Sequence, residues 1–504
     1  MLVAAFLLFV VFIPGPAGAG ENDLGAVLAQ FDAYNDEVFE KSGVPGMAVA
    51  VVRDDEVIYL RCFGVKNITT GEPVAPDTVF QLASISKSFT SATIASLVGD
   101  GILSWDDRVS DINPDFQLGG DQWISGHVTL RDLLSHRTGL PEYGADELFS
   151  LGYNRSEIIE KLQYIRLTGD FRSSYAYSNI GITTAADTAA KKTGTEWEEL
   201  IKERIFIPAG MANTSARFSD FENASDRVDT YPMVNGTATP GPLLNDDVNS
   251  PAGGVSSTVN DMIRYAMLQL NEGSIDGKQV IDAEALRETH KPQNILKSDN
   301  TGITAYGLGW EIYAEDGRIR VEHGGDLDTG VSTIVTLWPD ENMGLVVLTN
   351  GFPDGYSLKK AVSSGWSDLY FKGDIQKDWY SETDAELKAF LQAGILAGSS
   401  SEALPSAPED AGPSRSLSDY TGSYYQDYLG TVTITEDDED ETALLAYVGH
   451  LATPLVLSHY DGDIFVDSES GTGVYFTAGS GGTIDCVNFT IFDYGWTDGI
   501  FSRV

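Results

Sequence analysis

Hydrophobic and polar positions follow two different spacings in the first hundred residues. From Pro45 the segment PGMAVAVVRDDEVIYLRCFGV holds two β-rich runs on either side of a polar Arg-Asp-Asp step, which predicts a β-hairpin. From Ser84 the spacing becomes that of a buried helix, and two glycines mark its end. The apolar residues with helical spacing are Ile85, Phe89, Ala92, Leu97 and Val98.

The region that follows, up to about His290, is mostly helical with polar loops. Its clearest helical segments are RSEIIEKLQYI, ITTAADTAAKKTG and VNDMIRYAMLQLNEG. Strand patterns return in YGLGWEIYAEDGRIRVEHGGD and in GVSTIVTLWPDENMGLVVLTNG, and a helix over 356–371 closes the unit. Because strands at both ends bracket the helical insertion, we expect a single sheet built from both ends with helices on its faces, an α/β arrangement.

Composition changes after this unit. Residues 397–416, AGSSSEALPSAPEDAGPSRS, are rich in Ser, Pro, Ala and Gly, lack periodicity and predict a linker. Short strands separated by Gly, Asp and Ser turns then predict an all-β module of barrel or sandwich type. We therefore expect a first domain over 25–373, a helix and flexible linker over 374–416, and a small β domain over 417–504.

The chain is strongly acidic, with 75 acidic against 32 basic residues and a formal net charge of −43. Such a surface repels phosphate backbones and anionic lipid, so we expect no nucleic-acid partner. The acidity fits either a salty habitat or a secreted, highly soluble enzyme. Self-repulsion weighs against extended assemblies, while a homo-oligomer stays open.

The N-terminal residues resemble a secretory signal. An apolar run from Leu2 to Ile13 precedes a small-residue Ala-Gly-Ala step, which predicts cleavage after Ala19 and a signal peptide over 1–19, although the positive n-region is missing. The run is too short to cross a bilayer, and no later segment is long and apolar enough to do so, so we expect a secreted or extracytoplasmic protein.

Cysteine and histidine usage predicts no cofactor and no metal. The chain contains no Cys-x-x-Cys and no His-Glu-x-x-His motif, and its 6 histidines are scattered. Cys62 and Cys486 lie at opposite ends of the chain. This separation favours two separate buried thiols over one cross-domain disulfide.

Three short motifs could carry chemistry. Ser84 lies three residues before Lys87, YSN occupies 177–179, and HGG occupies 323–325. Each motif alone is weak, because a serine at a helix start is usually an N-cap, a Tyr-x-Asn usually packs beside a turn, and a His-Gly-Gly is usually a turn.

In this order the three motifs resemble those of the serine β-lactamase and penicillin-binding superfamily, in its class C β-lactamase, D-alanyl-D-alanine carboxypeptidase and esterase branch. Similar supporting stretches are LRDLLSHRTGLPEY, SPAGGVSSTVNDMIRYA, YGLGW and VVLTNG. The resemblance covers roughly Gly25 to Gly373. It implies an α/β (α+β) domain with an antiparallel sheet flanked by helices plus a helical region. The implied activity is that of a serine hydrolase using an acyl-enzyme on a D-amino-acid peptide, a carboxylic ester or a β-lactam.

The same resemblance assigns the site residues. Ser84 would be the nucleophile, with Lys87 and Tyr177 as its acid–base partners, and the sequence leaves open which of the two takes the first proton. Asn179 would orient Lys87 and the substrate amide. Glycines at Gly324 and Gly325 would let the substrate approach the strand, and the backbone N–H groups of Ser84 and Asp326 would form the oxyanion hole.

One position departs from the β-lactamases. They carry lysine where this chain has His323, and histidine there is typical of esterase-like and D-aminopeptidase-like relatives. A fixed positive charge is then missing near neutral pH, which puts β-lactam hydrolysis in doubt. We interpret His136 as structural, and Asp326 and Asp328 as turn residues.

Two alternatives to an enzyme keep the same fold: a catalytically silent sensor and an assembly-forming structural protein. The presence of Ser84, Lys87 and Tyr177 together favours the enzyme. The stretch DYTGSYYQDYLGTVTI resembles the lipocalin-like β-barrel appended to some members of the family. We expect this accessory domain to limit which substrates enter, or to help subunits associate, without joining in the chemistry.

Overall fold

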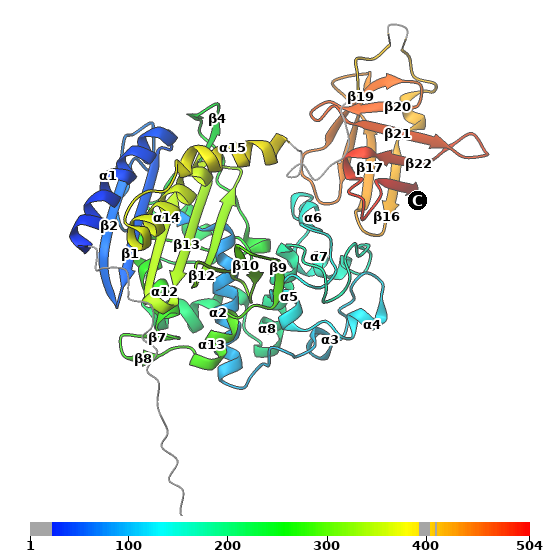
Figure 1. Cartoon of the computed structure of the whole chain (residues 1–504). Helices are drawn as coiled ribbons and strands as arrows, with labels where there is room; N and C mark the ends of the chain where they lie inside the picture. The colour runs from blue at the N-terminus through cyan, green and yellow to red at the C-terminus, as the bar shows by residue number, and fades with distance from the viewer. Residues whose placement is uncertain (1–22, 393–403, 409–410) are drawn as a thin grey trace, which may run out of the picture.

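The computed structural model describes residues 23–392, 404–408 and 411–504 (Figure 1). The predicted signal segment and part of the predicted linker lie outside these residues. In the described part of the chain no helix combines the length and apolar character that crossing a bilayer requires. Cys62 and Cys486 are both partly buried free thiols.

An eight-stranded antiparallel sheet forms the centre of the first domain, in the order β2-β1-β14-β13-β12-β11-β10-β9. The N-terminal hairpin pairs with the last strand of the C-terminal set, as the bracketing strand patterns predict. The strands are β1 (Gly46–Arg53), β2 (Glu56–Gly64), β9 (Asn294–Asp299), β10 (Gly302–Tyr306), β11 (Glu311–Glu315), β12 (Arg318–Leu327), β13 (Val331–Trp338) and β14 (Met343–Thr349).

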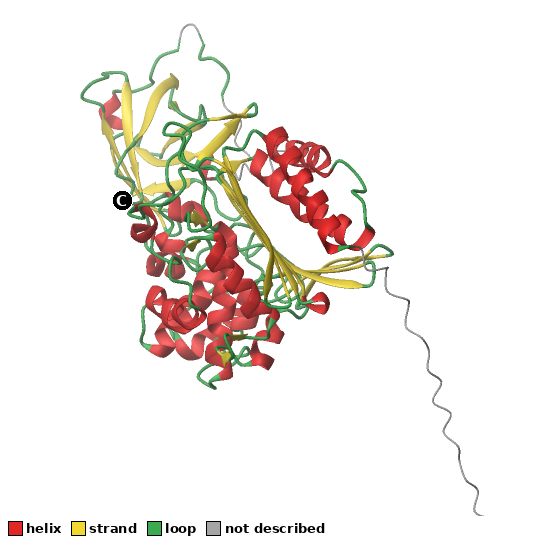
Figure 2. Ribbon diagram, turned by 90° about the vertical axis from the view of Figure 1, so that its left-hand side faces the viewer, coloured by secondary structure: helices red, strands yellow, loops and turns green. Residues whose placement is uncertain are grey.

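Helices cover both faces of this sheet (Figure 2). On one face pack α1 (Leu24–Ser42) and α14 (Asp354–Lys372), with α15 (Trp379–Gln392) against α14. Strand β1 shows how the sequence divides the two cores, because successive side chains point to opposite faces. Met47, Val49 and Val51 join the core under α1 and α14, while Ala48 and Ala50 face the helical region.

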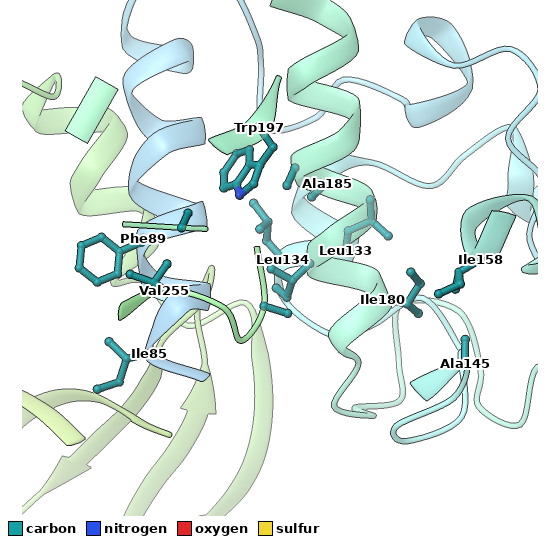
Figure 3. Packing of buried hydrophobic residues seen from close by; sticks show 14 of the residues in the cluster. Ile85, Phe89, Leu133, Leu134, Ala145, Ile158, Ile180, Ala185, Trp197 and Val255 are labelled. Carbon is teal, nitrogen blue, oxygen red and sulfur yellow. The ribbon is translucent and has the colours of Figure 1, made fainter. Parts of the chain in front are cut away.

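The helical region lies between the two halves of the sheet in sequence and against its other face in space. Its central element is α2 (Ser86–Gly99), which is buried from Ser86 to Leu97. The helices around it are α5 (Leu130–Leu134), α6 (Asp146–Ser150), α7 (Arg155–Lys161), α8 (Asn179–Thr193), α9 (Trp197–Ile201), α12 (Val259–Leu270) and α13 (Ala283–Thr289). Figure 3 shows Phe89 of α2, Ile180 of α8 and Trp197 of α9 in this apolar packing.

The C-terminal residues form a closed, all-antiparallel barrel of eight strands, which confirms the predicted β-barrel. Its strands are β16 (Gly422–Gln426), β17 (Gly430–Glu436), β18 (Ala443–Val448), β19 (Leu455–Asp461), β20 (Ile464–Asp467), β21 (Gly473–Ala478), β22 (Ile484–Phe489) and β23 (Ile500–Arg503). Buried aromatic side chains, Tyr420, Tyr424 and Phe465 among them, fill its interior.

The barrel is docked on the helical region beside α6 and α7 (Figure 1). The Tyr153 hydroxyl donates a hydrogen bond to the carbonyl of Leu429 at 2.8 Å, and the Lys161 ammonium donates to the carbonyl of Asp427 at 3.1 Å. The backbone N–H of His450 donates to the carbonyl of Leu151 at 2.9 Å. Side chains of both domains belong to one continuous apolar core.

Candidate active site

Ser84 lies in a single 3₁₀ turn, Ala83–Ile85, which leads directly into α2. The neighbouring residues are buried, and Ser84 is the residue of this turn that keeps partial exposure. Its hydroxyl does not cap the helix, since α2 begins at Ser86 with no side-chain cap. Ala83 holds a left-handed φ of 51°, a strained conformation for a residue with a Cβ. The N-cap interpretation of Ser84 is therefore wrong.

Lys87 lies one helical turn after Ser84 and is fully buried. Its ammonium nitrogen is 2.9 Å from the Ser84 hydroxyl oxygen and 2.9 Å from the carbonyl oxygen of Ala252. Burial lowers the pKa of Lys87 to about 7, against the opposing effect of the Asp146 and Asp246 carboxylates. A large fraction of a buried lysine of this kind is neutral at physiological pH, and a neutral amine can accept a proton.

Tyr177 lies two residues before α8, next to its N-cap residue Ser178. Its ring centroid is 4.6 Å from the Lys87 ammonium nitrogen. Burial holds the pKa of Tyr177 well above its usual value, while a hydrogen bond with Ser84 lowers it, so the side chain is a neutral phenol. The structure thus brings Ser84, Lys87 and Tyr177 together, as the family resemblance implies.

His136 contacts the segment that contains Tyr177. Its Nδ1 accepts a hydrogen bond from the Ser178 backbone N–H at 3.1 Å, and its ring packs 4.7 Å from that of Tyr177 and 4.6 Å from that of Tyr306. Burial holds the pKa of His136 well below its usual value, so the ring is neutral. These contacts match the structural role expected for this histidine.

The amide of Asn179 has a different partner from the one expected. Its nitrogen donates to Oδ2 of Asp146, at the start of α6, over 2.7 Å, and no hydrogen bond joins it to Lys87 in the described structure. Burial raises the pKa of Asp146 to about 8 and that of Asp246 to about 7. Neither aspartate belongs to a recognised motif, so the sequence offered no signal for them.

His323 is buried and uncharged. Its Nδ1 lies 2.7 Å from the carbonyl oxygen of Gly324, which can only accept, so Nδ1 carries the proton and donates. Its Nε2, 3.0 Å from the Tyr306 hydroxyl, then accepts a hydrogen bond from it. Burial lowers the pKa of His323 to about 3. The side chain therefore supplies no positive charge at neutral pH.

Strand β12 passes beside the Ser84 turn at the two glycines. A Cβ on Gly325 would lie 2.1 Å from the carbonyl oxygen of Leu82, so only glycine fits here. The Thr333 hydroxyl donates to the same carbonyl at 2.7 Å. Gly325 thus permits the strand to pack on the nucleophile turn, whereas the partly exposed Gly324 borders the cavity, where a substrate can approach it.

Asp326 and Asp328 differ in structure. The expected turn contains Asp328, which is exposed, but Asp326 belongs to β12. The reason is a buried cation on α14: the Lys359 ammonium donates to both carboxylate oxygens of Asp326 at 2.7 Å and to the carbonyl of Gly325 at 2.9 Å. This ion pair fixes the end of the strand, and the sequence alone did not indicate Lys359.

These side chains line a cavity of about 840 Å³ that opens at Ser84. Its wall includes Tyr177, Asn179 and His323, and α15 contributes part of its rim through Leu387 and Phe390. The cavity is acidic. The carboxylates that line it are Glu142, Asp146, Asp246, Glu311, Asp326, Asp328 and Glu386. Both lining lysines are already paired, Lys359 with Asp326 and Lys360 with Glu322.

Comparison with known proteins identifies relatives of both domains. The Beta-lactamase family matches residues 27–362, and a domain of unknown function (DUF3471) matches residues 406–498. Beta-lactamase-like protein 2 of Dictyostelium discoideum is 30% identical over 326 residues, 62% of this chain and 58% of that protein. Unguisins hydrolase ungD' of Aspergillus campestris is 26% identical over 80% of this chain and 77% of its own.

A third relative is the D-alanyl-D-alanine-carboxypeptidase/endopeptidase AmpH of Escherichia coli, 26% identical over 67% of this chain and 87% of its own. The chain therefore spans a little over half of the Dictyostelium protein and most of the other two.

Two solved structures share the fold. An octameric penicillin-binding protein homologue from Pyrococcus abyssi superposes with a TM-score of 0.59 at 19% identity, over 93% of this chain and 96% of its own. A class C beta lactamase from Rhodobacter sphaeroides superposes with a TM-score of 0.53 at 24% identity, over 66% of this chain and 97% of its own. With its first domain matched almost from end to end, this chain belongs to the Beta-lactamase family.

Proposed function

We propose that this protein is a serine hydrolase that cleaves an amide or ester through an acyl-enzyme on Ser84. The observation that carries the proposal is the 2.9 Å contact between the Ser84 hydroxyl and the buried Lys87, whose pKa is about 7. A serine hydroxyl is a weak nucleophile until a base takes its proton, and a partly neutral lysine at hydrogen-bond distance can do so.

In the first half-reaction, Oγ of Ser84 attacks the carbonyl carbon and its proton moves to Nζ of Lys87. The C=O π electrons move to the carbonyl oxygen. When that oxygen re-forms the double bond, the bond to the leaving group breaks, and the departing nitrogen or oxygen takes a proton from Tyr177, which Lys87 restores. Water then attacks the acyl-enzyme by the same steps, releases the acid and regenerates the Ser84 hydroxyl.

The pKa directions of the two groups favour Lys87 as the proton acceptor and Tyr177 as the proton donor. Tyr177 has a pKa well above 10 and keeps its proton near neutrality, which suits a proton donor, whereas Lys87 titrates near 7, which suits an acceptor. The backbone N–H groups of Ser84 and Asp326 are the proposed donors to the developing oxyanion. Their proximity is supported by the close packing of Gly325 on the Ser84 turn.

The cavity favours peptides and esters over β-lactams as substrates. A carboxylate on the substrate would meet a neutral His323 and a Lys359 already committed to Asp326, among several acidic side chains. One relative, AmpH of Escherichia coli, is a D-alanyl-D-alanine-carboxypeptidase/endopeptidase, which supports a peptide substrate. We also propose that the protein acts outside the cytoplasm, since its N-terminal residues resemble a secretory signal.

A parallel screen of p-nitrophenyl esters, D-amino-acid peptides and nitrocefin tests this proposal. We expect turnover of uncharged esters or peptides, and Ser84→Ala should remove nearly all of it, a loss on the order of 10⁶-fold. Turnover that survives in Ser84→Ala would contradict the assignment. A complete lack of reaction with every class would favour the silent sensor.

A further inference from the structure

One wall of the catalytic cavity, the segment 142–146, is held in an unusual backbone conformation. Glu142, Tyr143 and Asp146 all line the cavity. Tyr143 has a φ of 55° and Ala145 a φ of 75°, both in the left-handed region that disfavours residues with a Cβ. Such conformations persist only where surrounding contacts enforce them. We call residues 142–146 the strained wall. Its backbone conformation requires contacts from neighbouring parts of the structure.

The strained wall contacts the catalytic segment directly. The backbone N–H of Tyr143 donates to the carbonyl oxygen of Tyr177 at 2.8 Å, and Asp146 accepts from the Asn179 amide at 2.7 Å. A further bond within the wall runs from the Asp146 N–H to the Tyr143 carbonyl at 3.1 Å. A displacement of this wall would therefore displace Tyr177 and Asn179.

Intrinsic helix stability does not fix the wall. It leads into α6, which has only five residues and whose N-cap residue, Ala145, supplies no side-chain cap. Helices this short are marginal by themselves and depend on tertiary contacts. The Ala145 side chain is buried, near Ile158 and Ile180 in Figure 3, and this packing anchors one side of the wall.

The C-terminal barrel holds the other side. The second residue of α6 is Glu147, and its Oε1 accepts hydrogen bonds from the Tyr428 hydroxyl and, at 3.3 Å, from the Trp496 indole N–H. Tyr428 lies in the β16–β17 turn and is almost completely buried, and Trp496 lies between β22 and β23. Two separate loops of the barrel therefore converge on one carboxylate, next in sequence to the aspartate that holds Asn179.

We propose that Glu147 is a positioning residue through which the barrel holds the strained wall against Tyr177 and Asn179. The barrel touches no reacting atom, yet it shapes the site. This inference rests on the proposed function, because the residues it positions are the proposed acid–base partner and its neighbour. It gives the accessory domain a role that neither substrate gating nor subunit association includes.

The test uses Tyr428→Phe in the full-length chain, which removes one hydroxyl. The matched control is Lys161→Met, which removes another hydrogen bond of the same interface, to the Asp427 carbonyl, and leaves both hydrogen bonds to Glu147 in place. We expect kcat for an uncharged p-nitrophenyl ester to fall about tenfold in Tyr428→Phe with KM nearly unchanged, since small misplacements of catalytic groups cost rate. Lys161→Met should keep the kcat of the wild type.

Hydrogen exchange supplies a readout that does not depend on activity. The Tyr143 and Asp146 amides, which are hydrogen-bonded in the wall, should exchange faster in Tyr428→Phe than in the wild type or in Lys161→Met. Two variants of Glu147 extend this test. Glu147→Gln keeps an acceptor oxygen and should retain the protection of the Tyr143 and Asp146 amides from exchange, whereas Glu147→Leu should lose that protection.

The outcomes separate this inference from the proposed function. If the wild type turns over neither esters nor peptides, the proposed function fails, and the exchange data alone decide whether the barrel holds the wall. If the wild type is active and Tyr428→Phe matches Lys161→Met in both kcat and exchange, the positioning role is overturned. Equal losses in the two variants, in step with equal losses of thermal stability, also overturn it.

Discussion

The ammonium nitrogen of Lys87, in the buried first turn of α2, lies 2.9 Å from the hydroxyl oxygen of Ser84, in the 3₁₀ turn that leads into this helix. The two residues are three apart in sequence, so the continuous helical turns align them. The second hydrogen-bond partner of the Lys87 ammonium is the neutral carbonyl of Ala252. Burial beside these two neutral partners lowers the pKa of Lys87.

The pH dependence of catalysis should report the titration of Lys87. If Lys87 accepts the Ser84 proton, it must be neutral, so kcat/KM for an uncharged ester should rise about tenfold per pH unit below pH 7 and level off above it. Asp146 and Asp246 face the lysine and raise its pKa when ionised, so Asp246→Asn should move the midpoint to lower pH. A kcat/KM that shows no limb near pH 7 and keeps rising into strongly alkaline solution would instead identify Tyr177 as the base, because burial holds its pKa well above the usual value.

Lys87 should destabilise the fold at neutral pH. Its pKa is about 7 in the folded chain and near 10.5 when unfolded, so the unfolded chain binds more protons between these values and stability rises with pH across this window. Removing the amine in Lys87→Met eliminates this penalty but leaves the Ala252 carbonyl without its donor, which costs about 1–3 kcal/mol. We expect a net gain of about 2 kcal/mol at pH 7, shrinking toward pH 10.

Lys359→Met is the matched control for this measurement. Lys359 is equally buried but is paired with Asp326, so its loss leaves this partly exposed carboxylate without its cation, although the Ser332 hydroxyl still donates to it. We expect Lys359→Met to destabilise the fold by about 1–3 kcal/mol. Denaturant unfolding at pH 7 and pH 10 distinguishes the two lysines. The same sign of change in both variants at pH 7 would contradict the contrast between an unpaired and a paired amine.

Tyr177→Phe should slow the reaction without unfolding the protein. The variant keeps the ring that packs on His136 and loses the hydroxyl that we propose as the proton donor. A loss of roughly 10²–10⁴-fold in kcat is expected for an acid–base group. The loss should be smaller for esters with good leaving groups, such as p-nitrophenol, than for amides, which need protonation to depart. Equal losses for both substrate types would argue against a donor role.

His323→Lys should change the preference for substrate charge. Because His323 is neutral, the wild type offers a substrate carboxylate no fixed cation at this position. A lysine there should raise activity toward carboxylate-bearing β-lactams relative to simple esters. An unchanged ratio of kcat/KM between nitrocefin and a p-nitrophenyl ester would mean that position 323 only shapes β12.

The sequence predicted most of the architecture because its periodicities are strong. The two β-rich runs of the N-terminal hairpin and the hairpin around residues 339–342 predict one sheet assembled from both ends of the first domain, and the structure pairs β1 with β14. The β-barrel is confirmed as well. Helix α1, in contrast, was not among the predicted elements. Helix α1 packs on the sheet domain by burying Phe31 against Trp366 of α14, and these two residues are more than 300 positions apart in the sequence.

The site was predictable only where short-range motifs carry it. Ser84, Lys87, Tyr177 and His323 lie in recognisable short motifs. The structure brings Ser84, Tyr177 and His323 to one cavity and places Lys87 in contact with Ser84. Asp146, Asp246 and Lys359 were missed, because each acts through a partner distant in sequence. The Asn179 amide shows the same limit, since its partner is determined by how α6 packs beside α8.

Mass spectrometry of the chain after reaction with a fluorophosphonate tests whether Ser84 is the activated nucleophile. We expect one covalent adduct per chain, located by peptide mapping on Ser84 and absent from Ser84→Ala. Labelling should slow below pH 7, where Lys87 is protonated. An adduct on any other serine with Ser84 unmodified, or no adduct on a folded chain, would contradict the claim that Ser84 is the activated nucleophile.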